Sequence, residues 1–232
     1  MRYVEKSNTL RSPRTLLALL VAVAIVVAAL LVVLSQFGGG GGGSGGDAGG
    51  LYSGIPQSGT KLGESGAPVT IYLYEDFQCP ICGQFSKETL PEVVNRDVRG
   101  GDVKVVSEPL TFIGSDSVPA ARAAFAAGEQ DLFWPYASLL FENQGQENSG
   151  YVTDDFLKGL AQDTPGLDVG KWSADLNGNP YTQELQAAQA KAQSSGVNAT
   201  PTLVISGPGG QTKLVGPDYD QISQAIAQVD GS

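Results

Sequence analysis

DFQCPICGQF, residues 76–85, holds the two cysteines of this 232-residue chain, Cys79 and Cys82, three positions apart. A pair with this spacing can be a reactive redox couple, half of a metal site or a structural cross-link. Which of the three it is decides most of what the sequence says about fold and function.

The residues around the cysteines predict a strand followed directly by a helix. VTIYLY, residues 69–74, is a run of β-branched and aromatic residues, which indicates a buried strand. Pro80 suits the first position of a helix, because its missing N–H would have no partner there and its φ is already helical. The sequence therefore predicts a helix over about 80–94 whose N-cap residue is Cys79.

This position would make Cys79 reactive. The free backbone N–H groups of Ile81 and Cys82 and the positive end of the helix dipole would surround its sulfur. These donors favour the thiolate over the thiol and so lower the pKa of Cys79, as a nucleophilic cysteine requires. Cys82 would lie further inside on the same side of the first turn, where it can attack a mixed disulfide at Cys79 and release the bound partner.

A structural cross-link or a metal site would use the same two residues. A disulfide between neighbours in one helical turn constrains the unfolded chain little, so its stabilising effect is small. A zinc site needs four ligands, and the chain has no histidine and no second CxxC pair. We favour a redox-active pair, and the two alternatives remain open.

Composition excludes several other kinds of chemistry. The formal net charge of −10 argues against a nucleic-acid partner, because phosphate binding needs clustered Lys and Arg. The absence of histidine excludes Ser-His-Asp and Cys-His mechanisms. Chemistry in this chain must then come from sulfur, carboxylates, Tyr or Lys, and we expect it to need no cofactor and no metal.

The remaining sequence predicts further strands and helices in a definite order. A second strand is predicted over 103–106, and helical patterns dominate 118–195. The segments TLVIS (202–206) and QTKLV (211–215) flank the turn signal GPGG, which predicts an antiparallel hairpin. An amphipathic helix over 219–229 completes the order of strand, helix, strand, helical insertion, hairpin and helix.

The N-terminal part has the pattern of a membrane anchor. Leu16–Leu34 is an apolar run without a charge, about the length that crosses a roughly 30 Å hydrocarbon core as a helix. The basic residues before it indicate a cytoplasmic N-terminus and an exported remainder, with the anchor uncleaved. The predicted organisation is a cytoplasmic segment (1–14), a transmembrane signal anchor (15–37), a flexible Gly-rich linker (38–60) and one domain (61–232) with its helical insertion at about 118–195.

These elements resemble the DsbA-like branch of the thioredoxin superfamily. The resemblance rests on the CPIC motif, in which Pro80 directly follows the first cysteine, and on NATPT, residues 198–202. It covers nearly all of 60–230 and implies an α/β, thioredoxin-like fold with an inserted helical subdomain. It also implies a cis-proline at Pro201 beside the cysteines, with the backbone of Thr200 pairing with an extended substrate segment.

Two positions depart from the pattern of the family. Its best-known members carry a histidine just before the second cysteine, where the charge helps to hold the thiolate, but here the residue is Ile81. We therefore expect a less acidic Cys79 and a less oxidising couple. Many relatives bury an acid for proton transfer six residues before the first cysteine, where this chain has Leu73. Glu75 and Asp76 are candidates for that role, although we expect solvated charges at the strand end.

The resemblance implies a membrane-anchored, outward-facing bacterial thiol–disulfide oxidoreductase that introduces disulfides into exported proteins. Its catalytic residues would be Cys79 and Cys82. Its partners would be exported protein thiols and a membrane quinone-linked protein of the DsbB or VKOR-like kind, which reoxidises it. We expect a monomer, because no added dimerisation domain is visible. Two alternatives remain: a reductase or isomerase on the same fold, and a non-catalytic thioredoxin-like binding or chaperone module.

Overall fold

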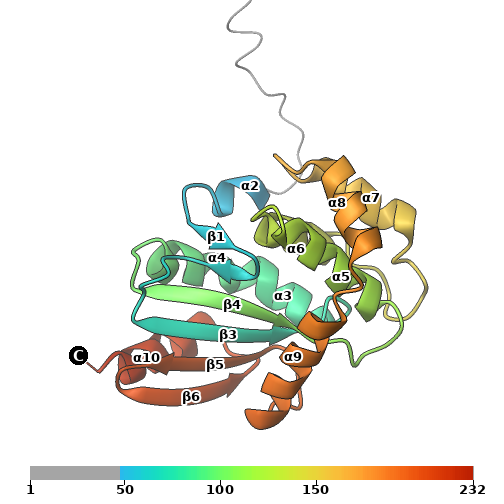
Figure 1. Ribbon diagram of the computed structural model, residues 1–232. Coiled ribbons are helices and arrows are strands. Elements are labelled where there is room, and N and C mark those ends of the chain that lie inside the picture. The colour runs from blue at the N-terminus through green and yellow to red at the C-terminus, as the bar shows by residue number, and fades with distance from the viewer. Residues whose placement is uncertain (1–47, 232) are drawn as a thin grey trace, which may run out of the picture. The chain divides into compact units, whose positions relative to one another are not determined.

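The computed structural model describes residues 48–231 (Figure 1). The predicted cytoplasmic segment, the transmembrane anchor and the first part of the glycine-rich linker lie outside the described residues. Among the helices of residues 48–231, none combines the length and the apolar character needed to cross a membrane.

The folded domain begins earlier than the sequence predicts. The linker predicted over 38–60 is wrong for residues 48–60, where helix α2 (Ala48–Leu51) and strand β1 (Gln57–Ser58) lie. Tyr52 and Ile55, in the same stretch, are buried in the core. Glycines and polar residues surround these two apolar side chains, so composition alone hides their role as anchors.

Within residues 48–231 the strands form one six-stranded sheet in the order β1-β2-β4-β3-β5-β6. The central pair, β3 and β4, is parallel, while β5 runs antiparallel to β3 and β6 antiparallel to β5. The remaining strands are β2 (Lys61–Leu62), β3 (Val69–Glu75), β4 (Val103–Pro109), β5 (Thr202–Gly207) and β6 (Gly210–Val215).

The predicted strands and the predicted hairpin are confirmed. β3 and β4 are rich in β-branched residues that alternate between the two faces of the sheet, as their sequences require. The β5–β6 hairpin turns at Gly207 and Gly210, which are paired in register. The antiparallel pair β1–β2 was not predicted, because two residues per strand are too few to show a period.

Helices follow the predicted order with one interruption. The helix predicted over 80–94 is broken at Thr89, because Pro91 has no backbone N–H to continue the hydrogen-bond ladder. The helices are α3 (Pro80–Glu88), α4 (Leu90–Val93), the π-helical turn η1 (Val94–Val98), α5 (Ser117–Gly128), α6 (Phe133–Glu142), α7 (Asp154–Asp163), α8 (Val169–Gly178), α9 (Thr182–Ser194) and α10 (Tyr219–Asp230).

The helices cover both faces of the sheet (Figure 1). The main core lies on the face of Ile71 and Leu73, where α3, α4 and α10 pack. A smaller cluster lies on the opposite face, where Ala188 and Ala192 of α9 pack against Tyr74 of β3. Helices α5 to α8 form the insertion between β4 and α9, and α6 packs against α3. The insertion therefore rests directly on the helix that begins at the cysteines.

Candidate active site

Cys79 lies where the sequence places it, at the N-cap of α3. Its backbone is extended (φ −71°, ψ 116°), and Pro80 occupies the first turn. Its Sγ accepts a hydrogen bond from the backbone N–H of Cys82 at 3.4 Å. The Asp76 carbonyl accepts a hydrogen bond from the Cys79 N–H at 2.9 Å, which turns the chain from β3 into the helix. The short strand–turn–helix connection therefore holds the sulfur at the helix N-terminus.

The surroundings of Cys79 favour its thiolate. A hydrogen bond from the Cys82 thiol, together with bonds from the Thr200 side chain and from the amides of Cys82 and Ile81, lowers the pKa of Cys79 from 9.0 to about 6 against the opposing effect of burial. A thiol with this pKa is largely ionised at pH 7 and is also a good leaving group. The side chain is 7% exposed, so the sulfur is reachable only over a small area.

Cys82 has the opposite character. It is fully buried at 0% exposure. Burial, followed by its hydrogen bond to Cys79 and the negative charge there, raises the pKa of Cys82 far above its usual range. Both cysteines are in the free thiol form in this structure. The pair thus combines one accessible, acidic sulfur with one shielded sulfur that holds its proton.

The second motif lies beside the first, as the resemblance implied. The Thr200–Pro201 peptide bond is cis, and Cys79 Sγ lies 3.5 Å from the Thr200 carbonyl oxygen. A groove of about 240 Å³ lies between α3 and the β6–α10 loop, with the neighbouring residues Ile81 and Pro201 in its lining. Its apolar lining includes Ile81, Phe85, Pro201 and Pro217, and Glu88 and Asp218 add two carboxylates.

Ile81 points away from the core. It is 55% exposed and forms part of the groove wall. An apolar side chain at this position adds contact area for a peptide but supplies neither charge nor hydrogen bond to the sulfur of Cys79. The thiolate therefore depends on Cys82, on the Thr200 side chain and on backbone donors.

Glu75 is buried, and the expectation of a solvated charge there is wrong. It is 2% exposed, and its Oε1 accepts a hydrogen bond from the Ser107 hydroxyl at 2.6 Å. Leu73 and Glu75 are two residues apart on β3, so their side chains lie on the same face of the sheet. Burial, and then the charges of Cys79 and Asp76, raise the pKa of Glu75 to about 7. Leu73 has no carboxyl group for proton transfer, and Glu75 supplies a buried one on the same face of the sheet.

Asp76 is also buried, contrary to expectation, but its carboxylate makes different hydrogen bonds from that of Glu75. Its Oδ1 accepts the N–H of Gln78 at 3.0 Å, and its Oδ2 accepts the N–H of Ile113 at 3.2 Å. Burial raises the pKa of Asp76, and these hydrogen bonds oppose the rise. Asp76 therefore fixes the loop that precedes Cys79.

Several polar residues that support the site were not predicted. The Gln144 amide donates to the carbonyls of Phe77 and Cys79 at 2.9 and 3.1 Å. A side chain at Gly83 would clash with Gln144, because a Cβ there would lie 2.6 Å from its Oε1. The buried Gln78 bonds the hydroxyl of Ser117 and the backbone of Asn148. Gln144, Ser117 and Asn148 come from the insertion, far along the chain, and no local pattern marks them.

Comparisons with known proteins agree with this geometry. A family model described as thioredoxin matches residues 57–227. Disulfide bond formation protein D of Bacillus subtilis is 28% identical over 169 residues, which cover 71% of this chain and 74% of that protein.

Solved structures give the same result. The crystal structure of oxidised BdbD from Bacillus subtilis has a TM-score of 0.65 and 26% identity, covering 75% of this chain and 96% of that one. Chlamydia trachomatis DsbA has a TM-score of 0.65 and 25% identity, covering 73% and 90%. The chain therefore belongs to the thioredoxin superfamily and is a DsbA-like thiol:disulfide oxidoreductase.

Proposed function

We propose that this protein introduces disulfides into exported proteins by exchange at Cys79 and Cys82, on the outer side of a bacterial membrane to which residues 15–37 anchor it. The single observation that carries the exchange chemistry is the position of Cys79. Its sulfur lies at the N-terminus of α3, bonded by the Cys82 N–H and beside the Thr200 carbonyl.

The reaction begins with the Cys79–Cys82 disulfide form of the protein. A substrate thiolate attacks Cys79 Sγ, since Cys82 is fully buried and Cys79 is not. The bond between the two protein sulfurs breaks, a mixed disulfide forms at Cys79, and the electron pair stays on Cys82.

A second substrate thiolate completes the transfer. It attacks the substrate sulfur in the mixed disulfide and expels Cys79 as a thiolate, a favoured leaving group because its pKa is about 6. The substrate gains one disulfide and loses two electrons, and the protein is left with two reduced cysteines. A membrane quinone-linked partner of the DsbB or VKOR-like kind then takes up these electrons.

Glu75 supplies the proton that Cys82 needs. Cys82 leaves as a thiolate of very high pKa inside the protein, so a nearby acid must protonate it. Glu75 is buried, its charge interacts with both cysteines, and its pKa of about 7 lets it act as acid or base near neutral pH. Asp76 is less suited, because both its oxygens accept backbone N–H groups.

The substrate occupies the groove between α3 and the β6–α10 loop. An extended segment there can pair with the backbone of Thr200 and place its cysteine over Cys79. The apolar side chains of Ile81 and Pro217 contact residues on either side of that cysteine. This arrangement suits unfolded chains, whose apolar residues are still exposed.

A trapping experiment tests this function. The Cys82→Ala variant cannot form the Cys79–Cys82 disulfide, but its Cys79 thiolate should attack disulfides of oxidised substrate proteins, releasing one substrate thiolate. Mixed disulfides should accumulate, because Cys82 is no longer present to attack Cys79 and release the substrate. These adducts should disappear on reduction and should be absent from a Cys79→Ala, Cys82→Ala control. A Cys82→Ala variant that forms none, although it is folded and its thiol is alkylated, contradicts exchange at this site.

The direction of electron flow has its own test. The equilibrium potential of the Cys79–Cys82 couple, measured in glutathione buffers, should lie in the range of about −120 to −180 mV that suits an oxidant. A value near −270 mV would indicate a reductase instead.

A further inference from the structure

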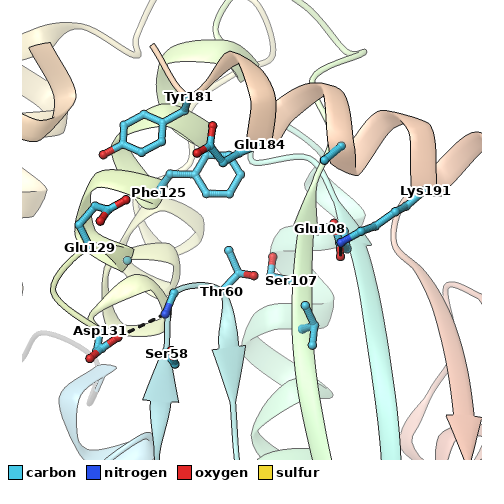
Figure 2. Close-up of a pocket in the computed structure, with 14 residues that line it drawn as sticks. Ser58, Thr60, Ser107, Glu108, Phe125, Glu129, Asp131, Tyr181, Glu184 and Lys191 are labelled. Carbon is cyan, nitrogen blue, oxygen red and sulfur yellow. Dashed lines mark hydrogen bonds and ion pairs between the residues drawn. The ribbon is translucent and has the colours of Figure 1, made fainter. Parts of the chain in front are cut away.

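A pocket of about 510 Å³ opens on a side of the domain that the exchange chemistry does not use (Figure 2). It lies between the β1–β2 turn, the end of β4, the C-terminal end of α5 and helix α9. None of its lining residues belongs to the CPIC motif or to the Thr200–Pro201 segment. Carboxylates surround it, contributed by Glu108, Glu129, Asp131 and Glu184.

Ser107 links this pocket to the buried acid. It lines the pocket, and Figure 2 shows it between Thr60 and Glu108. Its hydroxyl donates to Glu75 Oε1 at 2.6 Å. Both residues are almost fully buried, Ser107 at 1% and Glu75 at 2% exposure. One hydrogen bond therefore separates the pocket wall from the carboxyl group beside the cysteines.

The other side of the cysteine pair is closed while a substrate is attached. A mixed disulfide at Cys79 places the substrate chain over the small exposed area of that sulfur, and Cys82 has none of its own. Water then has no exposed sulfur surface to pass on its way to Glu75, so a Glu75 carboxylate that must gain a proton while the substrate is attached needs a path from another side.

We propose that Ser107 connects Glu75 to water in this pocket, so that protons reach Cys82 from the side opposite to the substrate. The proposal rests on the proposed function and adds the path by which protons reach Cys82. Ser107 acts through Glu75 and is therefore a positioning residue.

The proton transfers balance in each direction. When Cys82 is expelled as a thiolate, it takes the proton of the Glu75 carboxyl group. The Glu75 carboxylate takes the proton of the Ser107 hydroxyl, and Ser107 takes one from water or hydronium in the pocket. The net change is one proton from solvent to Cys82, and no electrons move along this path. The sequence runs backwards when Cys82 attacks a mixed disulfide.

The other charged or titratable groups that act on Glu75 offer no such route. They are Cys79 and Cys82 from α3, Asp76 from the loop after β3, and Tyr52 from the segment after α2. The Asp76 oxygens accept backbone N–H groups. The Tyr52 hydroxyl bonds Ser138 at 2.9 Å. Ser107 is thus the neighbour of Glu75 that also reaches the pocket.

The test compares two reductants of the oxidised protein in single-turnover experiments at about pH 8. Glu75, whose pKa is about 7, then starts mostly as the carboxylate and must gain its proton during the reaction. A peptide with two cysteines covers Cys79 when it reacts, whereas dithiothreitol is small and leaves room for water. Ser107→Ala should slow the reaction with the peptide by about tenfold, which is less than the roughly 10²–10⁴-fold of a group that itself protonates the reacting atom, because Ser107 acts through Glu75. The dithiothreitol rate should change by less than about twofold, since protonation from the front remains possible there. In Ser107→Ala, the ratio of the rate in H₂O to the rate in D₂O should rise for the peptide reaction and should stay at the parental value for dithiothreitol.

Two further variants distinguish an effect on the proton route from an effect on local packing. Thr60→Val removes another pocket hydroxyl that does not bond Glu75, and it should leave both rates at the parental values. Ala187→Phe, on the exposed face of α9, fills the pocket without touching the core, and it should slow the peptide reaction as Ser107→Ala does.

The outcomes are distinguishable. If both Ser107→Ala and Ala187→Phe keep the parental ratio of peptide rate to dithiothreitol rate, or slow both reactions equally, the route is wrong and the proposed function stands. If the unchanged protein oxidises neither reductant, the proposed function fails, and the route fails with it.

Discussion

The two sides of the cysteine pair are built on different principles. On the substrate side, Cys79 meets an apolar groove and main-chain donors, and Thr200 and Ile81 contribute position and surface. On the inner side, buried side chains carry protons, with Glu75 bonded to Ser107. One side recognises a peptide chain, and the other side controls the charge that exchange leaves behind. A change on either side should therefore affect a different step.

The largest effect should come from removing the buried acid. Glu75→Gln keeps the shape and the hydrogen bond but cannot transfer a proton, so oxidation of a two-cysteine peptide should slow by about a hundredfold. In the parent, the rate per substrate thiolate should fall as pH rises through about 7, because Glu75 loses the proton it must donate. Stopped-flow measurements of Glu75→Gln should show no such fall in rate near pH 7. If Glu75→Gln oxidised the peptide as fast as the parent, proton transfer by the inner side would not be needed for exchange.

Asp76 should matter for stability more than for exchange. Asp76→Ala leaves the buried N–H groups of Gln78 and Ile113 without a partner, which should lower the free energy of unfolding by about 2 kcal/mol or more. At a temperature where the variant is folded, its exchange rate should fall less than that of Glu75→Gln. Urea unfolding and peptide oxidation measure the two effects. If Asp76→Ala slows exchange more than Glu75→Gln, the roles of the two acids are reversed.

The Cys79 thiolate should make the reduced form more stable as pH rises. The pKa of Cys79 is depressed from 9.0 to about 6 in the folded protein, so its contribution is full above pH 9 and is lost as pH falls through 6. At pH 7 it should amount to about 1–2 kcal/mol. Glu75 is present in both redox forms, so the effect of its own burial cancels in the difference, which leaves Cys79 and the part of the Glu75 shift that the Cys79 charge causes.

Thermal unfolding of both redox forms measures this contribution. The stability of the reduced form relative to the oxidised form should increase between pH 6 and 8.5. A difference that stays constant over this range would mean that the substrate side does not hold a thiolate.

The smallest effect should come from restoring a charge beside Cys79. Ile81 is exposed, so Ile81→His is expected to fold normally, and its imidazolium should stabilise the thiolate below about pH 6.5. A decrease of about one pKa unit would raise the potential of the couple by about 30 mV. Glutathione equilibration at pH 6 measures the shift, with Ile81→Gln as an uncharged control. An equal shift in both variants would assign the effect to polarity or packing.

On the substrate side, the N-cap position of Cys79 could be predicted from the local sequence, and the cis-proline beside it was implied by the family resemblance. Pro80 after a cysteine specifies an N-cap whatever the rest of the chain does, and Thr200–Pro201 precedes a strand that the β-branched pattern identifies. The central strands and the final helix could be predicted for the same reason, since period and turn residues are properties of short segments.

The inner side could not be predicted in the same way. Two adjacent acids at the end of a strand are solvated in most proteins, but both are buried here, with Glu75 bonded to Ser107 of β4 and Asp76 bonded to the backbone of Ile113. Ser107 is one serine in a strand, and its bond to Glu75 depends on the register of β3 and β4. Gln144 and Asn148 reach the cysteine loop from distant positions in the chain, which no periodicity reveals.

The central claim is that main-chain donors and Cys82 hold the Cys79 sulfur as an anion. The rate of alkylation of the fully reduced protein by iodoacetamide, followed at Cys79 by mass spectrometry from pH 4 to 10, measures this directly. The account predicts a titration midpoint near 6. A midpoint between about 8.5 and 9, as for a free cysteine, would contradict it.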